Sequence, residues 1–202
     1  VSSFSKLMAR ADSGDTKAEA ELAFAYLRGD GVGSNSAQAL RWANEAATHG
    51  EPVAQYLLGT LYQQGQKNSV KADPAHAFQL FSASAAQGNI KAMHNLAIAY
   101  AEGLGIAKDE SQAAQWFERA ASHGYVDSAF DLAVLYERGQ GVRQSLTDAL
   151  RWYSIAAMAG DKASADRAAF LRHQVSPKDA MLASNAAASF APLAPIGAAN
   201  RL

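Results

Sequence analysis

The 202-residue chain contains no cysteine, only five prolines and no long unbroken apolar run. The absence of cysteine excludes a disulfide framework, a thiolate zinc site and a cysteine nucleophile, and it fits a reducing or an oxidising compartment equally well. No stretch approaches the roughly 20 apolar residues that cross a bilayer, so we expect no membrane insertion of this part of the protein. Because the sequence starts at Val1 rather than at methionine, we expect it to be a fragment of a longer protein.

Charge is also scarce. Charged residues make up 18% of the chain, with 18 basic against 19 acidic side chains. A nucleic-acid binder needs a concentrated basic face that displaces counterions, and no run of lysine or arginine exists, so nucleic acid is excluded as a partner. Apolar residues make up 49%, which excludes disorder for most of the chain. Many of them are alanines, and small side chains favour closely packed helices.

An internal repeat is the clearest positive feature. The pattern A-x-x-x-L-(A/G)-x-x-Y-x-x-G occurs four times, with Ser128 in place of the leading alanine in the last copy, and its leucines are 36, 38 and 36 residues apart. A fixed period of this length predicts stacked helix-turn-helix units, because a leucine and a tyrosine four positions apart share one helical face. These residues are Leu22 and Tyr26, Leu58 and Tyr62, Leu96 and Tyr100, and Leu132 and Tyr136.

A second half-pattern follows in each unit and predicts the partner helix. All three tryptophans, Trp42, Trp116 and Trp152, occupy one position of it, and Leu80 takes that position in the second unit. Tryptophan is bulky and mostly buried in proteins, so we expect this position to belong to the core of each repeat rather than to a binding site.

Glycines predict where the helices turn. A glycine follows the second helix of each unit, where the left-handed conformation costs this residue nothing. His49 and His123 precede two of these glycines, and we expect both to contact the exposed carbonyls of the helix end. The glycines are Gly50, Gly88, Gly124 and Gly160.

In the first, third and fourth units the loop between the paired helices reads G-x-G followed by an apolar residue. Val32, Ile106 and Val142 are expected to fill the gap between the two helices. The loop of the second unit, from Gly65 to Val70, is two residues longer, and we interpret it as a surface insertion. No strand precedes these loops and no GK[ST] follows them, so they are not predicted to bind phosphate.

Both ends of the chain depart from the repeat, as the ends of a repeat array do. We expect a half-repeat helix over residues 1–15, four repeats over 16–162, capping helices over 163–189 and an extended or disordered tail over 190–202. Ser176 and Pro177 predict the start of the last helix, over 177–189. Phe4, Leu7 and Met8 are expected to leave an apolar surface for self-association or for attachment of upstream sequence.

From Lys17 to Lys162 the two half-patterns resemble the Sel-one-like repeat, a longer relative of the tetratricopeptide repeat. The resemblance implies an all-α fold, a right-handed α/α superhelix (solenoid) of about four helix-turn-helix repeats with helical caps. It also implies that the protein is an adaptor for protein partners in multi-protein assemblies.

A narrower resemblance concerns two stretches, Gly88 to Ala97 and Tyr136 to Val142. They are similar to the C-terminal repeats of PodJ, a family of alphaproteobacterial polarity factors. This similarity implies a periplasmic domain of a larger, membrane-anchored protein, working as a polar localisation scaffold for flagellar, pilus or adhesive structures. The coiled coil and membrane span of that family are absent from this stretch of sequence, so the cytoplasm is the alternative compartment.

In such an array the first helices line the concave side. Taking the repeat leucine and tyrosine as inward anchors yields an apolar stripe with charges at its margins, which is typical of a groove that binds an extended or helical partner segment. The competing interpretation is that the superhelix buries these side chains internally. The predicted partner-binding residues are Phe24, Arg28, Tyr56, Thr60, Gln63, His94, Ile98, Glu102, Phe130, Val134 and Arg138.

Nothing in the sequence predicts catalysis. The five histidines form no H-x-x-x-H or H-E-x-x-H pair, and no G-x-S-x-G elbow is present. Asp109 and Glu110 form an acidic pair, and helix capping accounts for it. We therefore predict no catalytic, metal-binding or cofactor-binding residue. Two other non-catalytic functions remain open: a periplasmic regulator that inhibits a sensor kinase, and a peptidoglycan-binding module whose groove aromatics stack on sugars.

Overall fold

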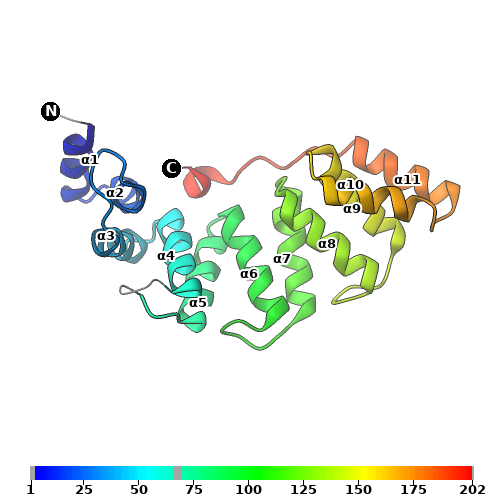
Figure 1. Ribbon diagram of the computed structural model, residues 1–202, viewed down its shortest axis with the longest axis horizontal. Helices are drawn as coiled ribbons and strands as arrows, with labels where there is room; N and C mark the ends of the chain where they lie inside the picture. The colour runs from blue at the N-terminus through cyan, green and yellow to red at the C-terminus, as the bar shows by residue number, and fades with distance from the viewer. Residues whose placement is uncertain (1–2, 66–69, 202) are drawn as a thin grey trace. The chain divides into compact units, whose positions relative to one another are not determined.

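The computed structural model describes residues 3–65 and 70–201, and the regular structure of this part is almost entirely α-helical (Figure 1). It comprises eleven α-helices and one short 3-10 helix, η1. The predicted fold class, an all-α solenoid of helix pairs, is confirmed. The elements are α1 Ser3–Asp12, α2 Thr16–Arg28, α3 Ser36–Thr48, α4 Pro52–Gln64, α5 Pro74–Ala86, α6 Ile90–Glu102, α7 Glu110–Ser122, α8 Val126–Arg138, α9 Leu146–Met158, α10 Lys162–Arg172, α11 Pro177–Ala188 and η1 Gly197–Asn200.

The repeat appears in the structure as helices of equal length. Each of the helices from α2 to α9 is 13 residues long. The first and second helices of a repeat pack against each other in the pairs α2 and α3, α4 and α5, and α8 and α9. Helices of equal length that recur at a nearly constant interval are what the sequence period predicts.

The chain divides into two compact units. Unit 1 consists of the described residues within Val1–Ala92, Leu104–Ile106 and Pro195–Leu202, and unit 2 consists of Met93–Gly103 and Ala107–Ala194. Each unit has its own apolar core. The repeat leucines Leu22 and Leu58 lie in the core of unit 1, and Leu132 lies in the core of unit 2, as predicted.

The tryptophan position is buried to different degrees. Trp42 and Trp152 are 4% and 2% exposed and belong to the cores of unit 1 and unit 2. Trp116 is only half-buried, as is Leu80 at the same position of the second repeat. The core assignment is therefore confirmed for two of the tryptophans and too strong for Trp116, whose ring lies 4.5 Å from the guanidinium carbon of Arg119.

Local signals begin and end the helices as predicted. The side chain of Asp109 accepts a hydrogen bond from the backbone N–H of Gln112 at 3.0 Å, so this residue caps α7. The four glycines that end the second helices have φ angles of +84°, +94°, +85° and +101°, which lie in the left-handed region. Among the apolar loop residues, Val32 and Val142 are half-buried, whereas Ile106 is 38% exposed and does not fill a gap. The inserted part of the second loop, residues 66–69, lies outside the described residues.

The prediction for His49 and His123 is wrong in the partners it names. The Nδ1 atom of His49 lies 2.9 Å from a carboxylate oxygen of Glu19 on α2. The Nδ1 atom of His123 lies 3.3 Å and 3.1 Å from the carbonyl oxygens of Leu193 and Ala194. Each imidazole therefore contacts a segment distant in sequence rather than the carbonyls of its own helix end.

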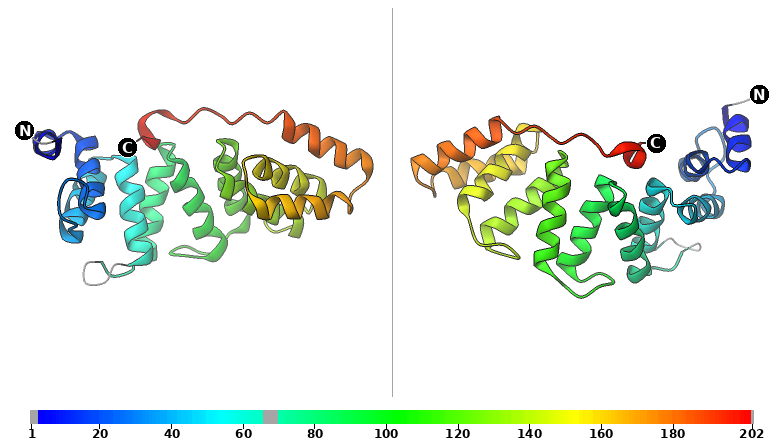
Figure 2. Two further views of the ribbon diagram at one scale, coloured as in Figure 1. Left: turned by 45° about the horizontal axis from the view of Figure 1, so that its top comes forward. Right: turned by 180° about the vertical axis from the view of Figure 1, so that it is seen from behind.

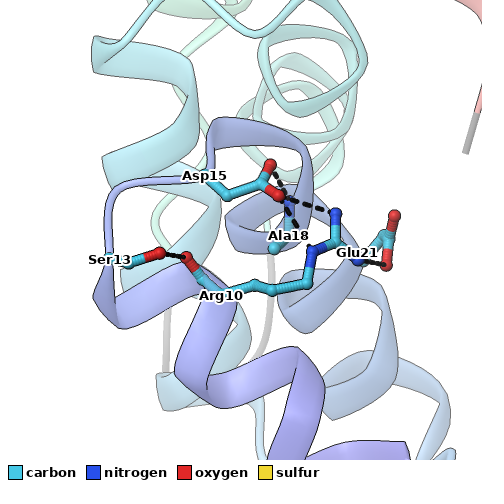
Figure 3. A network of polar contacts seen from close by, with 5 residues as sticks. All are labelled: Arg10, Ser13, Asp15, Ala18 and Glu21. Carbon is cyan, nitrogen blue, oxygen red and sulfur yellow. Dashed lines mark hydrogen bonds and ion pairs between the residues drawn. The ribbon is translucent and has the colours of Figure 1, made fainter.

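Helix α1 packs on α2 through the residues expected to remain open. The ring of Phe4 meets the ring of Tyr26 edge-on, with 5.6 Å between centroids, and Leu7 and Met8 are half-buried in the core of unit 1. A polar network joins the same two helices (Figure 3). In it, the guanidinium of Arg10 donates to the carboxylate of Asp15 at 2.7 Å and 2.9 Å, and this pairing lowers the pKa of Asp15.

The C-terminal region consists of α10, α11, an extended segment and η1 (Figure 2). The helix predicted over 177–189 is present as α11, Pro177–Ala188, with the Ser176 hydroxyl accepting from the backbone N–H of Asp179. Residues 191–196 are extended, as expected for the tail, but η1 at Gly197–Asn200 is not predicted from the sequence.

Candidate functional site

The predicted groove residues divide between the two units. All of them lie on the first helices of the repeats, and the last turns of α2, α4, α6 and α8 contain Arg28, Gln63, Glu102 and Arg138. Unit 1 contains Phe24, Arg28, Tyr56, Thr60 and Gln63, and unit 2 contains His94, Ile98, Glu102, Phe130, Val134 and Arg138.

In unit 1 the predicted aromatic residues are half-buried and pack on neighbouring side chains. The guanidinium of the exposed Arg28 lies 5.1 Å from the centroid of the Phe24 ring. The ring of Tyr56 lies 6.2 Å from that of Phe81 on α5, and the hydroxyl of Thr60 donates to the Tyr56 carbonyl at 3.1 Å. Part of each aromatic side chain is thus buried inside the fold, and part stays accessible.

In unit 2 three predicted apolar residues are half-buried against the core: Ile98, Phe130 and Val134. The ring of Phe130 meets the ring of Tyr153 on α9, with 5.6 Å between centroids. Glu102 and Arg138, which bear the predicted marginal charges, are exposed. Phe130 therefore contributes to the packing of α8 on α9 as well as to the accessible face.

His94 is the predicted groove residue that the structure places inside the protein. It is 9% exposed, its Nδ1 atom lies 2.8 Å from the hydroxyl of Ser128, and its ring lies 5.0 Å from that of Tyr125. Burial lowers the pKa of His94, so the neutral imidazole is favoured. A side chain held in this way is unavailable to a partner.

Asp131 lies beside this histidine, and the pKa of its carboxyl group is shifted far from the ordinary value. One carboxylate oxygen lies 4.0 Å from His94 Nδ1. Burial, followed by the charges of Asp127 and Glu102, raises the pKa of Asp131 to about 6. Serine catalysis requires the hydroxyl and the acid on opposite ring nitrogens of the histidine, whereas here both approach Nδ1. The cluster is therefore not arranged for nucleophilic catalysis.

An ion pair joins α8 to α10 at the edge of the same face. The guanidinium of Arg167 donates to the carboxylate of Glu137, and the Tyr153 hydroxyl donates to that carboxylate at 3.0 Å. These hydrogen bonds, with that from Arg167 first, hold the pKa of Glu137 below its usual value. The pair fixes α10 beside α8, so α10 extends the row of first helices.

Phe170 on α10 is not among the predicted partner-binding residues, yet it occupies the same position in the repeat as two of them. Ile98 and Val134 each stand two positions after a repeat leucine, and Phe170 follows Val134 at the repeat period of 36. It is 52% exposed, and the guanidinium of Arg167 lies 4.6 Å from its ring centroid. The segment from Ala163 to Gln174 lacks the repeat tyrosine and glycine, which hides this relation, but the 36-residue spacing alone reveals it.

Within the described ranges, no group of three or more histidine, aspartate or glutamate side chains is placed to hold a metal ion. None of the helices described is long and apolar enough to span a bilayer. The arrangement that remains is a set of accessible apolar side chains on first helices with charges beside them, which suits contact with another macromolecule.

Comparison with known proteins agrees with the repeat geometry. The model of the family described as "Sel1 repeat" matches four consecutive segments, 16–51, 52–89, 90–125 and 126–161. The fold is similar to that of c5321, a protective antigen of uropathogenic Escherichia coli that displays an SLR fold, with a TM-score of 0.82 and 28% identity over 94% of this chain and 41% of that one. A Sel1 repeat protein from Oxalobacter formigenes matches with a TM-score of 0.78 and 25% identity, over 94% of this chain and 79% of that one.

A curated relative matches a shorter stretch. Protein SHC1 of Saccharomyces cerevisiae is 42% identical over 60 residues, which cover 30% of this chain and 11% of that protein. This chain thus spans about a tenth of the yeast protein and less than half of the Escherichia coli antigen.

Proposed function

The chain belongs to the Sel1 repeat family, and from that premise we propose that it is a non-catalytic scaffold domain whose first helices bind segments of partner proteins. Sel1 repeat proteins generally are protein–protein interaction scaffolds, and their fold is typically non-catalytic.

The observation that carries the proposal is the unit 2 first-helix surface, which we define as Ile98, Val134 and Phe170. These side chains recur at one register position of α6, α8 and α10. Ile98 and Val134 are half-buried, and Phe170 is 52% exposed. Large exposed aromatic residues in a row of partly buried apolar side chains are typical anchors of protein interfaces. Burying the Phe170 ring against a partner would contribute about 1.5 kcal/mol or more.

The charges around this surface indicate the kind of segment that it accepts. Arg167 lies against the Phe170 ring and is paired with Glu137, while Glu102 and Arg138 are exposed. Both signs are present, so the partner segment is expected to carry an apolar anchor with mixed charges beside it rather than a block of one sign. In unit 1, Phe24 with Arg28 presents the same chemistry on α2.

The biological setting that we propose is polar localisation in the periplasm, as part of a larger membrane-anchored protein. Support comes from the similarity of Gly88 to Ala97 and of Tyr136 to Val142 to the repeats of a polarity-factor family. The partners would then be polar localisation or envelope proteins. A sensor kinase ectodomain or peptidoglycan strands are the competing occupants, and the experiment distinguishes all three.

The test uses the full chain as bait in a bacterial envelope extract, with Phe170→Glu and the matched control Met158→Glu. Met158 is 67% exposed on the second helix α9, so the control adds the same charge in place of an exposed apolar residue away from the surface. We expect a protein that wild type and Met158→Glu retain and Phe170→Glu loses, with affinity at least tenfold weaker once it is purified.

The identity of the captured protein then separates the settings. A localisation or structural protein supports the scaffold, and a sensor kinase ectodomain supports the regulator instead. Binding of purified glycan strands in the absence of any protein supports the wall-binding module. Capture of the same proteins with equal affinity by all three baits would overturn the assignment of the first-helix surface.

A further inference from the structure

The short helix η1 near the C-terminal end of the described chain is held by the turn between α5 and α6, and it packs against α4. The carboxamide of Asn200 makes two hydrogen bonds there. Its Oδ1 accepts from the backbone N–H of Ile90 at 2.8 Å, and its Nδ2 donates to the carbonyl of Gly88 at 2.8 Å. The Nδ2 of Asn89 donates to the carbonyl of Ala199 at 2.6 Å. All these residues belong to unit 1.

Ile196 fixes the approach of the same segment. A Cβ added to Gly88 would lie 2.5 Å from the Cβ of Ile196, so the absence of a side chain at this buried glycine makes the contact possible. At the equivalent Gly50, an added Cβ would meet no atom within 4 Å. The turn at Gly88 is therefore covered by chain where the corresponding turn of the first repeat is open.

The residues of this turn explain why the segment binds here. The first residue of α4 is Pro52, which has no backbone N–H, whereas Ile90 offers one at the start of α6. The capping residue Asn89 uses its Oδ1 to accept from the backbone N–H of Ala92 at 2.9 Å, which leaves its Nδ2 for Ala199. The other first helices are preceded by Asp15, Glu51, Tyr125 and Asp161, none of which carries an amide donor in its side chain.

We propose that the turn Gly88–Asn89–Ile90 is a docking site for a short, uncharged peptide segment that carries asparagine four positions after an aliphatic residue, and that residues 196–200 occupy it as a displaceable internal ligand. The donors and acceptor of the turn are all neutral, and a carboxamide satisfies an N–H and a carbonyl together, which neither a carboxylate nor an amine does. The partner is thus a protein that presents this pattern.

Displacement is feasible because the aliphatic side chains of the segment are largely exposed. Ile196 and Leu193 are 48% and 58% exposed, and the segment between α11 and η1 is extended. A competing segment needs to replace the three hydrogen bonds, the partial cover over Gly88 and the packing of η1, with its buried Ala199, against α4. The site shares no residue with the first-helix surfaces, so it stands independently of the proposed function.

The test opens the site in the full chain and asks whether the segment binds again when it is added separately. The variant Ile196→Asp/Asn200→Asp removes the aliphatic contact and the donor to Gly88. Amide exchange measured by NMR at Ile90 reports release directly, because this N–H is the donor to Asn200. We expect exchange at Ile90 to become at least tenfold faster, while amides in the middle of α8 do not change.

A labelled peptide of residues 193–201 is then titrated against the opened variant and wild type. We expect binding to the opened variant, at least tenfold weaker binding to wild type, and none by a peptide carrying Asn200→Asp. Adding Asn89→Asp to the opened variant keeps the oxygen that caps Ala92 and removes the donor to Ala199, so affinity for the peptide should fall at least tenfold.

Two results would overturn the proposal. One is an opened variant with fast exchange at Ile90 that fails to bind the peptide, or binds it equally well with Asn89→Asp. The other is a wild-type chain that forms a concentration-dependent dimer in which the Ile90 amide is protected only in the dimer, because the occupant would then be a second copy rather than an internal ligand.

Discussion

The first and fourth repeats contain the same Gly-x-Gly loop in different surroundings. The second glycine of the loop has nearly the same φ in both, +70° at Gly31 and +69° at Gly141. A Cβ added to Gly31 would meet only the Cβ of Phe4, at an ordinary 3.6 Å, whereas one added to Gly141 would lie 2.0 Å from the carbonyl oxygen of Glu110. Gly105 in the third repeat resembles Gly141, with the carbonyl oxygen of Pro74 at 2.1 Å.

The difference shows that this glycine has two roles. In each of the three repeats that have it, it supplies a left-handed turn, and in the third and fourth repeats it also allows close stacking on the first turn of the preceding repeat's second helix. At Gly31 the described neighbour is the side chain of Phe4 on α1, and no backbone atom of the described residues lies within 4 Å of an added Cβ. A repeated residue therefore takes part of its role from its neighbouring repeat.

The same comparison holds at the residue that precedes the turning glycine. In the first repeat His49 contacts Glu19, and in the second Gln87 donates to Gln55 at 2.9 Å. The third repeat has Met93 at the position equivalent to Glu19, and there His123 contacts the C-terminal segment instead. Where the first helix of the repeat offers no polar partner, the residue before the glycine thus contacts the C-terminal segment instead.

The largest predicted effect tests the two roles of the loop glycine. Gly141→Ala should lower the free energy of unfolding by about 3 kcal/mol or more, because the methyl group collides with the backbone of Glu110 in addition to straining the turn. Gly31→Ala should cost only the left-handed strain, about 1 kcal/mol. Urea unfolding followed by circular dichroism compares them. Equal losses for the two variants would show that stacking adds nothing at Gly141.

The next largest effect compares His49, which contacts Glu19, with His123, which contacts the C-terminal segment. His49→Ala should cost about 2 kcal/mol of stability, because it leaves the carboxylate of Glu19, which is 2% exposed, without its imidazole partner. His123→Ala should cost about 0.5 kcal/mol, since its contacts with the C-terminal segment are exposed to solvent. The same urea titration applies. A loss at His123 as large as that at His49 would contradict the comparison.

Much of this fold is predictable from the sequence, because its determinants repeat. The repeat leucines, among them Leu22, Leu58 and Leu132, mark the buried face of the first helices, and the glycines mark the turns. The helix pairs and their order can therefore be predicted from the local sequence pattern. The exposure of individual side chains cannot be predicted from the sequence period. Whether Phe130 is free or Ile106 is covered depends on neighbours such as Tyr153 that no period specifies.

The candidate sites are predictable only where they keep the register. Phe170 keeps it, and the spacing from Val134 is sufficient to find it. The contact between Asn89 and the segment at Asn200 joins residues 110 or more positions apart, and it depends on single side chains that occur once in the array. No repeated sequence pattern predicts such a contact, so only the folded structure shows it.

A smaller effect, of opposite sign, contrasts two acidic residues at one repeat position. Glu21 in the first repeat lies 3.7 Å from Arg10, whereas Asp131 in the fourth repeat lies among acidic neighbours and has its pKa raised to about 6. Because this folded-state pKa exceeds the unfolded value of 3.8, the ionised carboxyl lowers stability above pH 6, and the penalty fades as the pH falls towards 4.

Asp131→Asn should therefore stabilise the chain by about 1 kcal/mol at pH 8 and by nearly nothing at pH 4, a modest value because the side chain is 36% exposed. Glu21→Gln should change stability little at either pH. Urea midpoints at the two pH values measure the difference between each variant and wild type. The burial that lowers the pKa of His94 destabilises wild type and variants alike on acidification, so it largely cancels in these differences. An Asp131→Asn variant no more stable than wild type at pH 8 would refute the burial penalty.

At the tryptophan position the repeats again share a residue and differ in surroundings, and the two variants are expected to differ in size of effect. Trp116→Leu should cost less than about 1 kcal/mol, because Trp116 is half-buried and the second repeat already holds the half-buried Leu80 there. Trp152→Leu should cost about 3 kcal/mol, since this ring is 2% exposed and lies 6.0 Å from the ring of Phe190, so its loss opens a cavity in the core of unit 2. Both losses are measured as shifts of the urea midpoint. Equal shifts for the two variants would show that the contribution of the tryptophan to stability does not depend on the residues packed against it.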